Sequence, residues 1–279
     1  MNAFEKIIHL LQYEVEIPKL FGAFHLLFLA LTLCAAVAFV GFVSRGDDKR
    51  YRKTLFVFWV VLVVFEIYRE LVFSLQVTDG VAVWDYAWYL FPFQLCATPL
   101  YIFPLVVFLP EGRVRQACKI YLSTFALFGG LVVMIYPGDV FCYYLGVNIQ
   151  SLIHHGLQLI GGVITVAVNR ENHTLKNLYK GAIVFLALVS VAILLNVGVH
   201  AYLVANQMSD TFNMFFISPY FPCTLPILSL IYPVVPYPVF LLIYILGFCI
   251  IALIMYYLSR LVMKVEEELL SLWKKAKVA

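Results

Sequence analysis

Apolar runs of about twenty residues follow one another along the chain, and short polar segments separate them. The runs cover residues 20–43, 54–75, 87–109, 117–136, 147–168, 178–206 and 237–263. At about 1.5 Å of rise per helical residue, each is long enough to cross roughly 30 Å of hydrocarbon. The pattern therefore predicts an all-α polytopic membrane protein, with seven transmembrane helices in one domain over residues 20–263.

Three segments lie outside these runs. Residues 1–19 alternate apolar and charged positions at helical spacing, which predicts an amphipathic helix on the membrane surface, with a disordered tail as the alternative. Residues 207–236 hold too many prolines for a spanning helix, so we expect an outer loop or a re-entrant segment. Residues 264–279 form the predicted cytoplasmic tail, with a solvated, mixed-charge helix over Glu266–Lys277.

The basic residues predict the orientation of the spans. Lysine and arginine occur in the segments after the first, third, fifth and seventh runs, and the three other connections between runs hold neither residue. Cytoplasmic loops are the ones enriched in lysine and arginine. We therefore expect the N-terminus outside and the C-terminus in the cytoplasm.

Composition narrows the class of protein further. The chain is 63% hydrophobic and 13% charged, with a mean hydropathy of +0.94, which excludes a soluble domain. The net charge of +3 is spread over short loops, so no nucleic-acid partner is expected. Six cysteines show no paired spacing, and only Cys142 and Cys223 fall in loops on one predicted side, where a single disulfide could form. Residues 1–20 lack the apolar core of a cleavable signal peptide.

The third run is unusual because it combines polar residues with prolines. Its prolines are Pro92, Pro99 and Pro104, and its polar side chains include those of Asp85, Gln94, Cys96 and Thr98. Proline removes a helical hydrogen bond, and lipid tolerates that loss only where protein or a water-filled cavity satisfies the freed carbonyl. We therefore predict a helix that its prolines break or kink around Cys96, and that faces a cavity. The alternative is that Cys96 is an inert small apolar residue.

Ionisable residues occur together in the second run. Glu66, Arg69 and Glu70 are spaced by three and four, so they share one helical face and the arginine can pair with either carboxylate. Ionisable groups inside a membrane are usually paired or functional. The cluster is therefore either a structural ion pair or part of a site for a lipid head group.

The fifth and sixth runs add polar stripes. Ser151, His155 and Gln158 follow Asn148 at spacings of three, four and three, and His154 lies at the edge of this stripe. In the sixth run Asn196 and His200 lie one turn apart. Cys96 and His155 both lie roughly 12–14 Å from the outer ends of their runs, and Glu66 lies at a similar level. We therefore expect these polar groups to line one cavity in the outer half of the bilayer.

Two short motifs carry a resemblance to a known family. Gln94-Leu95-Cys96 and His155-Gly156, in a chain of this length and span number, resemble the YwaF-like family of bacterial integral membrane proteins. That family is related to the eukaryotic membrane acyltransferase that places polyunsaturated chains on ether phospholipids using a cysteine and a histidine. The resemblance implies a bacterial plasma membrane and an acyl-transfer site, with Cys96 as the nucleophile. Either histidine could be the base, and His155 is preferred because it lies on the polar stripe and precedes glycine.

The resulting hypothesis is a phospholipid transacylase. The Cys96 thiolate attacks a lipid ester, forms an acyl-thioester and passes the chain to a lysolipid, without a cofactor or a metal. A site in the outer half of the bilayer favours a phospholipid donor over a cytoplasmic acyl-CoA. The partners are therefore membrane lipids, with the Arg69 guanidinium on the phosphate. The residues expected to bind substrate are Glu66, Arg69, Glu70, Gln94, Ser151, Gln158, Asn196 and His200.

Other functions remain open from the sequence. A broken helix beside buried charges is also typical of transporters, although we find no inverted repeat, and a receptor-like binding protein belongs to the same class. If water replaced the lysolipid, the same site would be an intramembrane lipid hydrolase. A metal-dependent hydrolase would need His154, His155, His200 and Glu66 together. Adjacent helical residues point about 100° apart, so the first two rarely share one metal.

Overall fold

The structure is a computed structural model that describes residues 3–278, except residues 45, 79 and 80. For residues 3, 4, 78 and 269–278 it describes the backbone but not the side chains. The long helices are α2 (Ala23–Ser44), α3 (Asp48–Ser74), α7 (Leu145–Val168), α8 (Leu178–Ala205) and α10 (Tyr237–Val278). The shorter ones are α1 (Ala3–Leu11), α4 (Pro99–Phe108), α5 (Arg113–Tyr121), α6 (Leu127–Ile135) and α9 (Leu228–Ile231).

Short helical turns and one hairpin complete the fold. The 3-10 turns are η1 (Trp88–Leu90), η2 (Leu95–Ala97), η4 (Leu175–Asn177), η5 (Met214–Phe216) and η6 (Tyr232–Val234). A π-helical turn, η3 (Leu122–Ala126), joins α5 to α6 without a break. Strands β1 (Leu75–Thr78) and β2 (Val81–Trp84) pair antiparallel, with Leu75 opposite Trp84. The apolar run over 54–75 gave no sign that α3 would continue into this hairpin.

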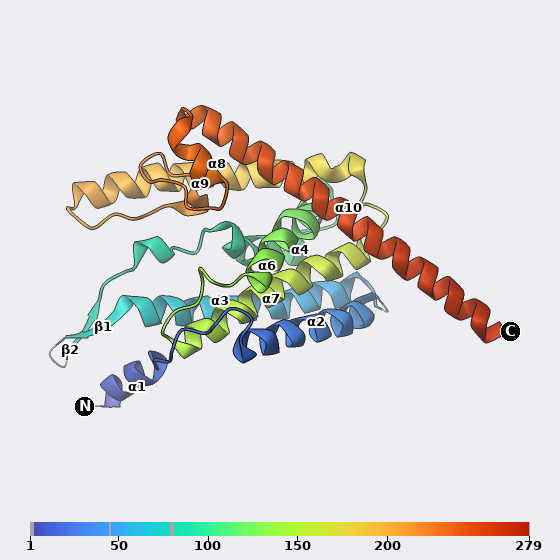
Figure 1. The fold of residues 1–279 in the computed structure, drawn as a ribbon, viewed down its shortest axis with the longest axis horizontal. Coiled ribbons are helices and arrows are strands. Elements are labelled where there is room, and N and C mark those ends of the chain that lie inside the picture. The colour runs from blue at the N-terminus through green and yellow to red at the C-terminus, as the bar shows by residue number, and fades with distance from the viewer. Residues whose placement is uncertain (1–2, 45, 79–80, 279) are drawn as a thin grey trace.

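The bundle has two distinct ends. The long helices lie side by side, with the N-terminus and the hairpin at one end and the C-terminus at the other (Figure 1). We call these the hairpin end and the basic end, because α3 and α5 begin at the second end with the lysines and arginines of residues 49–53 and 113–119. Termini at opposite ends are expected for an odd number of crossings. Which end faces the cytoplasm stays a prediction.

Within the described residues, five helices are long and apolar enough to cross a membrane. They are Ala23–Ser44, Arg113–Ile135, Leu145–Val168, Leu175–Ala205 and Tyr237–Glu268, and they confirm an all-helical membrane architecture at five of the seven predicted spans. Helix α3 has 27 residues but carries the charges of Glu66, Arg69 and Glu70, so its crossing stays a prediction.

The third predicted span differs from a single kinked helix over 87–109. Its first part is irregular, with η1 followed by extended residues, and the apolar helix begins only at Leu95 and ends at Phe108. Pro92 lies in the irregular part, Pro99 occupies the first turn of α4, and only Pro104 lies inside a helix. The span is thus broken before Leu95, next to Cys96, as one of the two predicted forms requires, and a kink at a proline is not confirmed.

Helix α7 lies at the centre of the bundle and packs on α2, α3 and the continuous α5–η3–α6 helix. Two glycines, Gly130 on α6 and Gly162 on α7, allow these two helices to approach each other closely. A Cβ atom on Gly130 would lie 2.7 Å from the Leu159 backbone nitrogen and 2.9 Å from the His155 carbonyl oxygen. A Cβ atom on Gly162 would lie 2.9 Å from the Leu122 carbonyl oxygen. Backbone contacts of this kind fix the position of α7, and with it the two histidines.

The N-terminal segment is attached to the hairpin end. Helix α1 ends at Leu11, earlier than the helix expected over 1–19. The Gln12 side chain donates to the carbonyl oxygens of Val72 and Leu75, both at 2.8 Å, and the Tyr68 hydroxyl donates to that of Leu11 at 2.7 Å. These bonds tie the segment to the last turn of α3. Its predicted location on the membrane surface is not tested by them.

The segment between α8 and α10 packs into the hairpin end instead of forming an open loop. Phe212, Met214 and Phe215 are fully buried. Phe215 and Phe216 adopt φ values of 58° and 56°, a left-handed conformation that is costly for residues with a side chain. The Asn196 side chain holds Met214 from both sides, donating to its carbonyl oxygen at 3.0 Å and accepting from its N–H at 2.7 Å.

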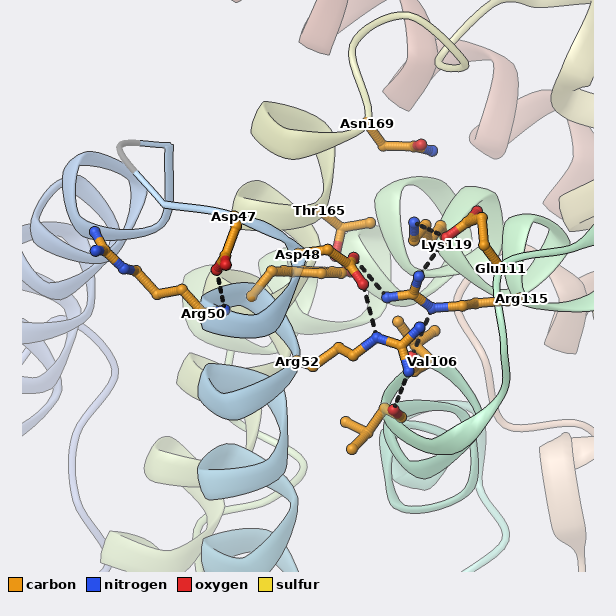
Figure 2. Close-up of polar contacts among 12 residues, drawn as sticks. Asp47, Asp48, Arg50, Arg52, Val106, Glu111, Arg115, Lys119, Thr165 and Asn169 are labelled. Atoms are coloured by element: carbon orange, nitrogen blue, oxygen red, sulfur yellow. Dashed lines mark hydrogen bonds and ion pairs between the residues drawn. The ribbon is translucent and has the colours of Figure 1, made fainter.

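A buried ion-pair cluster connects α3, α4 and α5 at the basic end (Figure 2). The Arg115 side chain is 0% exposed and donates to Val106 O at 2.8 Å, to Asp48 Oδ1 at 2.7 Å and to Glu111. The Lys119 ammonium donates to the same Glu111 carboxylate at 3.1 Å. From the sequence, these basic residues were interpreted only as orientation signals. Arg115 and Lys119 follow Glu111 at spacings of four, however, and that spacing is typical of ion pairs.

All six cysteines are free. The disulfide considered between Cys142 and Cys223 is therefore wrong for this structure. Cys223 is buried in the main apolar core, whereas Cys142 lies beside the first turn of α7 and faces a different cavity.

Candidate functional site

A cavity of about 280 Å³ lies between α3, α7 and the irregular segment before α4, toward the hairpin end. Cys96, Ser151, His154 and His155 all line it, as does Arg69. The expectation that these groups would converge came from helical spacing and depth alone. The structure brings them to one cavity, which is the arrangement that any joint chemistry requires.

Cys96 lies in the first turn of the apolar helix that runs from Leu95 to Phe108. The first N–H groups of a helix have no partner within the helix, and this end favours negative charge. The break before Leu95 therefore places the thiol where a thiolate is better stabilised than in the middle of a continuous helix.

His154 is the histidine that contacts Cys96. Its Nε2 atom lies 3.0 Å from the Cys96 carbonyl oxygen, and because a carbonyl oxygen only accepts, Nε2 carries the proton in this contact. Nδ1 then has a lone pair, and no hydrogen bond to it occurs among the described residues. The Cys96 thiol likewise makes no hydrogen bond to either imidazole in the described part of the chain.

His155 is held by its own helix. Its Nδ1 atom donates to the Ser151 carbonyl oxygen at 2.7 Å, and the Ser151 hydroxyl lies 3.5 Å from the same nitrogen. Nε2 is buried and has no partner. The two rings lie 5.3 Å apart between centroids. His154 thus contacts the backbone of Cys96, and neither ring is hydrogen-bonded to the thiol among the described residues, so which histidine is the base stays a prediction.

Arg69 forms the charged wall of the cavity. Its Nη2 atom donates to Glu66 Oε1 and to the Leu90 carbonyl oxygen, both at 2.5 Å, and lies 3.4 Å from Glu70 Oε1. Its Nε atom is buried without a partner, as are the second carboxylate oxygens of Glu66 and Glu70. The three residues therefore pair as expected, hold the irregular segment at Leu90, and retain unused hydrogen-bonding capacity.

Gln94 borders the cavity, but its amide serves the fold. Nε2 donates to the Asn213 carbonyl oxygen at 2.9 Å, and Oε1 accepts from the Phe215 N–H at 2.8 Å. Gln94 therefore fixes the strained segment at Phe215 against the cavity wall. A direct role in binding substrate stays a prediction.

Five candidates do not line this cavity: Glu66 and Glu70, which pair with Arg69 behind its wall, and Gln158, Asn196 and His200. Gln158 donates to the Ala126 carbonyl oxygen at 2.9 Å and faces η3. Asn196 holds Met214, and His200 pairs with Asp210 at 2.5 Å while stacking on Tyr220. His200 is therefore not grouped with His154 and His155, and among the described residues no cluster of three or more His, Cys, Asp or Glu could hold a metal ion.

Sequence reasoning missed several residues of the cavity wall. Gln150 lies one turn before His154 on α7, so the spacing of four was a usable signal. Asp139 and Cys142 come from the connection between α6 and α7, where no periodic pattern exists. Asn148 holds that connection by accepting from the Cys142 N–H at 2.9 Å and donating to its carbonyl oxygen at 2.8 Å.

These features define an all-helical integral membrane protein with a cysteine and two histidines around a cavity between its helices. The chain belongs to the TMEM164 family, whose model matches residues 20–256. The match begins before α2 and ends within α10, so it includes every residue of the cavity. No curated protein and no solved structure matches this chain.

Proposed function

We propose that this protein is a membrane lipid acyltransferase that moves a fatty acyl chain between phospholipids through a thioester on Cys96. The supporting observation is that Cys96, His154 and His155 line one cavity, where His154 Nε2 donates to the backbone carbonyl oxygen of Cys96. A thiol with an imidazole beside it is the arrangement that nucleophilic acyl transfer uses. The proposed location is a bacterial plasma membrane, as the resemblance to bacterial membrane proteins implies.

In the first half of the reaction, His154 Nδ1 takes the proton from the Cys96 thiol, and the thiolate attacks the ester carbonyl carbon of a phospholipid. The bond between that carbon and the glycerol oxygen then breaks. The departing lysophospholipid oxygen takes the proton from the imidazolium. The products are an acyl-thioester on Cys96 and a lysophospholipid.

In the second half, the hydroxyl group of an acceptor lysolipid gives its proton to His154 and attacks the thioester carbonyl carbon. The carbon–sulfur bond breaks, and Cys96 recovers its proton from the imidazolium. The acceptor leaves with the acyl chain. No net oxidation or proton loss occurs, so neither a cofactor nor a metal is required.

His154 is the proposed base because its ring lies against the Cys96 backbone, and the step requires the ring to release the Cys96 carbonyl oxygen and turn a nitrogen lone pair toward the thiol. His155 is the alternative because its Nε2 atom is buried and has no partner. In the apo state, catalytic hydrogen bonds are often longer than in the complex with substrate, so the missing bond between thiol and imidazole does not exclude either. The Arg69 guanidinium is the proposed partner of the lipid phosphate.

The test is intact-protein mass spectrometry after incubation with a phospholipid. The wild type should gain the mass of one acyl chain, removable by hydroxylamine, and Cys96→Ala should gain none. Cys142→Ala is the matched control, because Cys142 lines the same cavity without contacting a histidine. It should form the adduct as the wild type does.

Two results would argue against the proposal. If the wild type forms no adduct, even with the histidines replaced to trap the intermediate, a transporter or receptor-like protein becomes the better hypothesis. If Cys96→Ala retains the adduct, the nucleophile lies elsewhere. Release of free fatty acid without transfer to an added lysolipid would assign the same site to a lipid hydrolase.

A further inference from the structure

A second, larger cavity of about 790 Å³ lies between α4, α5 and α8. It is separate from the candidate active site and shares no residue with it. Its walls are apolar along most of their length, with Ile102 and Leu105 from α4, and Ile183 and Leu188 from α8. Such a groove accommodates a hydrocarbon chain.

Two basic side chains, those of Arg113 and Lys180, line the same groove. Each lies in the first turn of its helix, α5 or α8, at the basic end of the bundle. No acidic residue lines the groove. Within the described residues, neither side chain forms an ion pair, whereas the neighbouring Arg115 and Lys119 are both paired with Glu111. The groove therefore presents two unneutralised positive charges beside an apolar surface.

The length of the groove fits one leaflet of a bilayer. Its α8 wall runs from Lys180 to Val191, which is roughly 17 Å at 1.5 Å per residue. One leaflet contributes about 15 Å, half of the roughly 30 Å of hydrocarbon. A lipid with its head group at Lys180 would thus have its acyl chain beside α8 for the full depth of that leaflet.

We propose that this groove binds one anionic phospholipid of the leaflet at the basic end, with its phosphate between Arg113 and Lys180 and an acyl chain against α8. The charge distribution predicts that this leaflet is the cytoplasmic one, opposite the candidate active site. Basic residues next to a membrane helix attract anionic head groups, and the apolar wall adds the contact that a soluble phosphate lacks. This inference is independent of the proposed acyl transfer.

The test is native mass spectrometry of the full-length protein in detergent, with phosphatidylglycerol and phosphatidylcholine of identical acyl chains. The wild type should retain one phosphatidylglycerol in preference to phosphatidylcholine. The double variant Arg113→Gln/Lys180→Gln should lose roughly 30-fold in phosphatidylglycerol affinity, given the attraction contributed by each basic residue. Ala187→Trp, which fills the groove from an exposed position, should lower the affinity for both lipids.

The matched control is Lys49→Gln/Lys176→Gln, which removes two exposed charges from the same end outside the groove. It should keep the preference for phosphatidylglycerol. Equal retention of phosphatidylglycerol by the wild type and by Arg113→Gln/Lys180→Gln would overturn the proposed head-group site. Unchanged binding by Ala187→Trp would overturn the placement of the chain, and competition by inorganic phosphate alone would show that the site binds free anions instead of lipid.

Discussion

The polar groups around Cys96 at the hairpin end differ from those around Arg115 at the basic end. Buried nitrogen or oxygen atoms without a partner belong to five residues in or beside the first group: Glu66, Arg69, Glu70, Trp88 and His155. Among the described side chains of the second group, the Asn169 amide nitrogen is the only buried polar atom without a hydrogen-bond partner. The guanidinium of Arg115, by contrast, makes three hydrogen bonds.

Buried polar side chains therefore fall into two kinds in this protein, those with all partners present and those with atoms left unpaired. A satisfied network holds helices together, and its loss leaves charges without partners. Buried atoms that lack partners cost free energy, so they need a particular explanation. A carbonyl or phosphate group of a ligand would supply an acceptor to Arg69 Nε, whereas the unpaired oxygens of Glu66 and Glu70 require a donor such as a hydroxyl or ammonium group. The basic end needs no ligand to complete its network.

The largest expected effect is on catalysis. His154→Ala should lower the rate of thioester formation on Cys96 by about 10²–10⁴-fold, because the general base is lost. Rates measured by intact mass spectrometry give the comparison. His155→Ala should lower the rate less, since that ring does not contact Cys96.

The reverse order, with His155→Ala slower than His154→Ala, would make His155 the base. The thermal unfolding temperature of both variants should be recorded as well. Because His154 donates to the Cys96 carbonyl oxygen, His154→Gln separates positioning from proton transfer: it can keep a donor there but supplies no base.

The next effect concerns the stability of the basic end. Arg115→Met should lower the free energy of unfolding by about 1–2 kcal/mol, because the Val106 carbonyl oxygen and the bonds joining α3 to α5 lose their buried donor, whereas Asp48 and Glu111 are about half exposed and remain solvated. Catalysis per folded molecule should be unchanged. Chemical denaturation in detergent, followed by circular dichroism, measures the first quantity.

Arg113→Met is the control for that variant, since Arg113 is exposed and two residues away. It should change the free energy of unfolding by less than about 0.5 kcal/mol. A similar loss in both variants would mean that the buried network adds no stability, and the contrast between the two ends would fail.

An effect of similar size is expected from the close packing of α6 on α7. Gly130→Ala should destabilise the protein by about 1–3 kcal/mol, because the new Cβ atom meets backbone atoms of α7 that cannot move separately. It should also slow thioester formation, since the displaced turn contains His155. Gly198→Ala, where no atom lies within 4 Å of the new Cβ, should be neutral or slightly stabilising.

The smallest expected effect is a dependence of stability on pH through His173, which lies in the connection between α7 and α8. Burial, together with the charge of Arg260, lowers its pKa to about 4. Its ring nitrogens lie 2.9 Å from the Ser259 hydroxyl and 3.3 Å from the Ser123 hydroxyl. The stability from the neutral ring is present above the ordinary pKa of about 6.5 and is lost as the pH falls toward 4.

Thermal unfolding at several pH values checks this expectation. The unfolding temperature of the wild type should fall between pH 6.5 and 4, and that of His173→Gln should fall less. Parallel profiles for the two proteins would mean that another group causes the dependence.

The sequence alone determined the class of the protein and most of its helices. Five of the predicted spans correspond to helices that can cross a membrane, because hydropathy summed over a run is a property of that run and needs no knowledge of its neighbours. Helical spacing likewise placed His155 and Ser151 on one face of α7, where both line the cavity.

Only the tertiary structure decided the details of the candidate site. The proline content of the third run was visible, but the start of the helix at Leu95 depends on Arg69 holding Leu90 and Gln94 holding Phe215. The hydrogen bond from His154 to the Cys96 carbonyl oxygen joins residues 58 positions apart in the chain. Contacts of this kind follow from the register and distance between packed helices, which no local pattern specifies, and they determine the chemistry of the cavity.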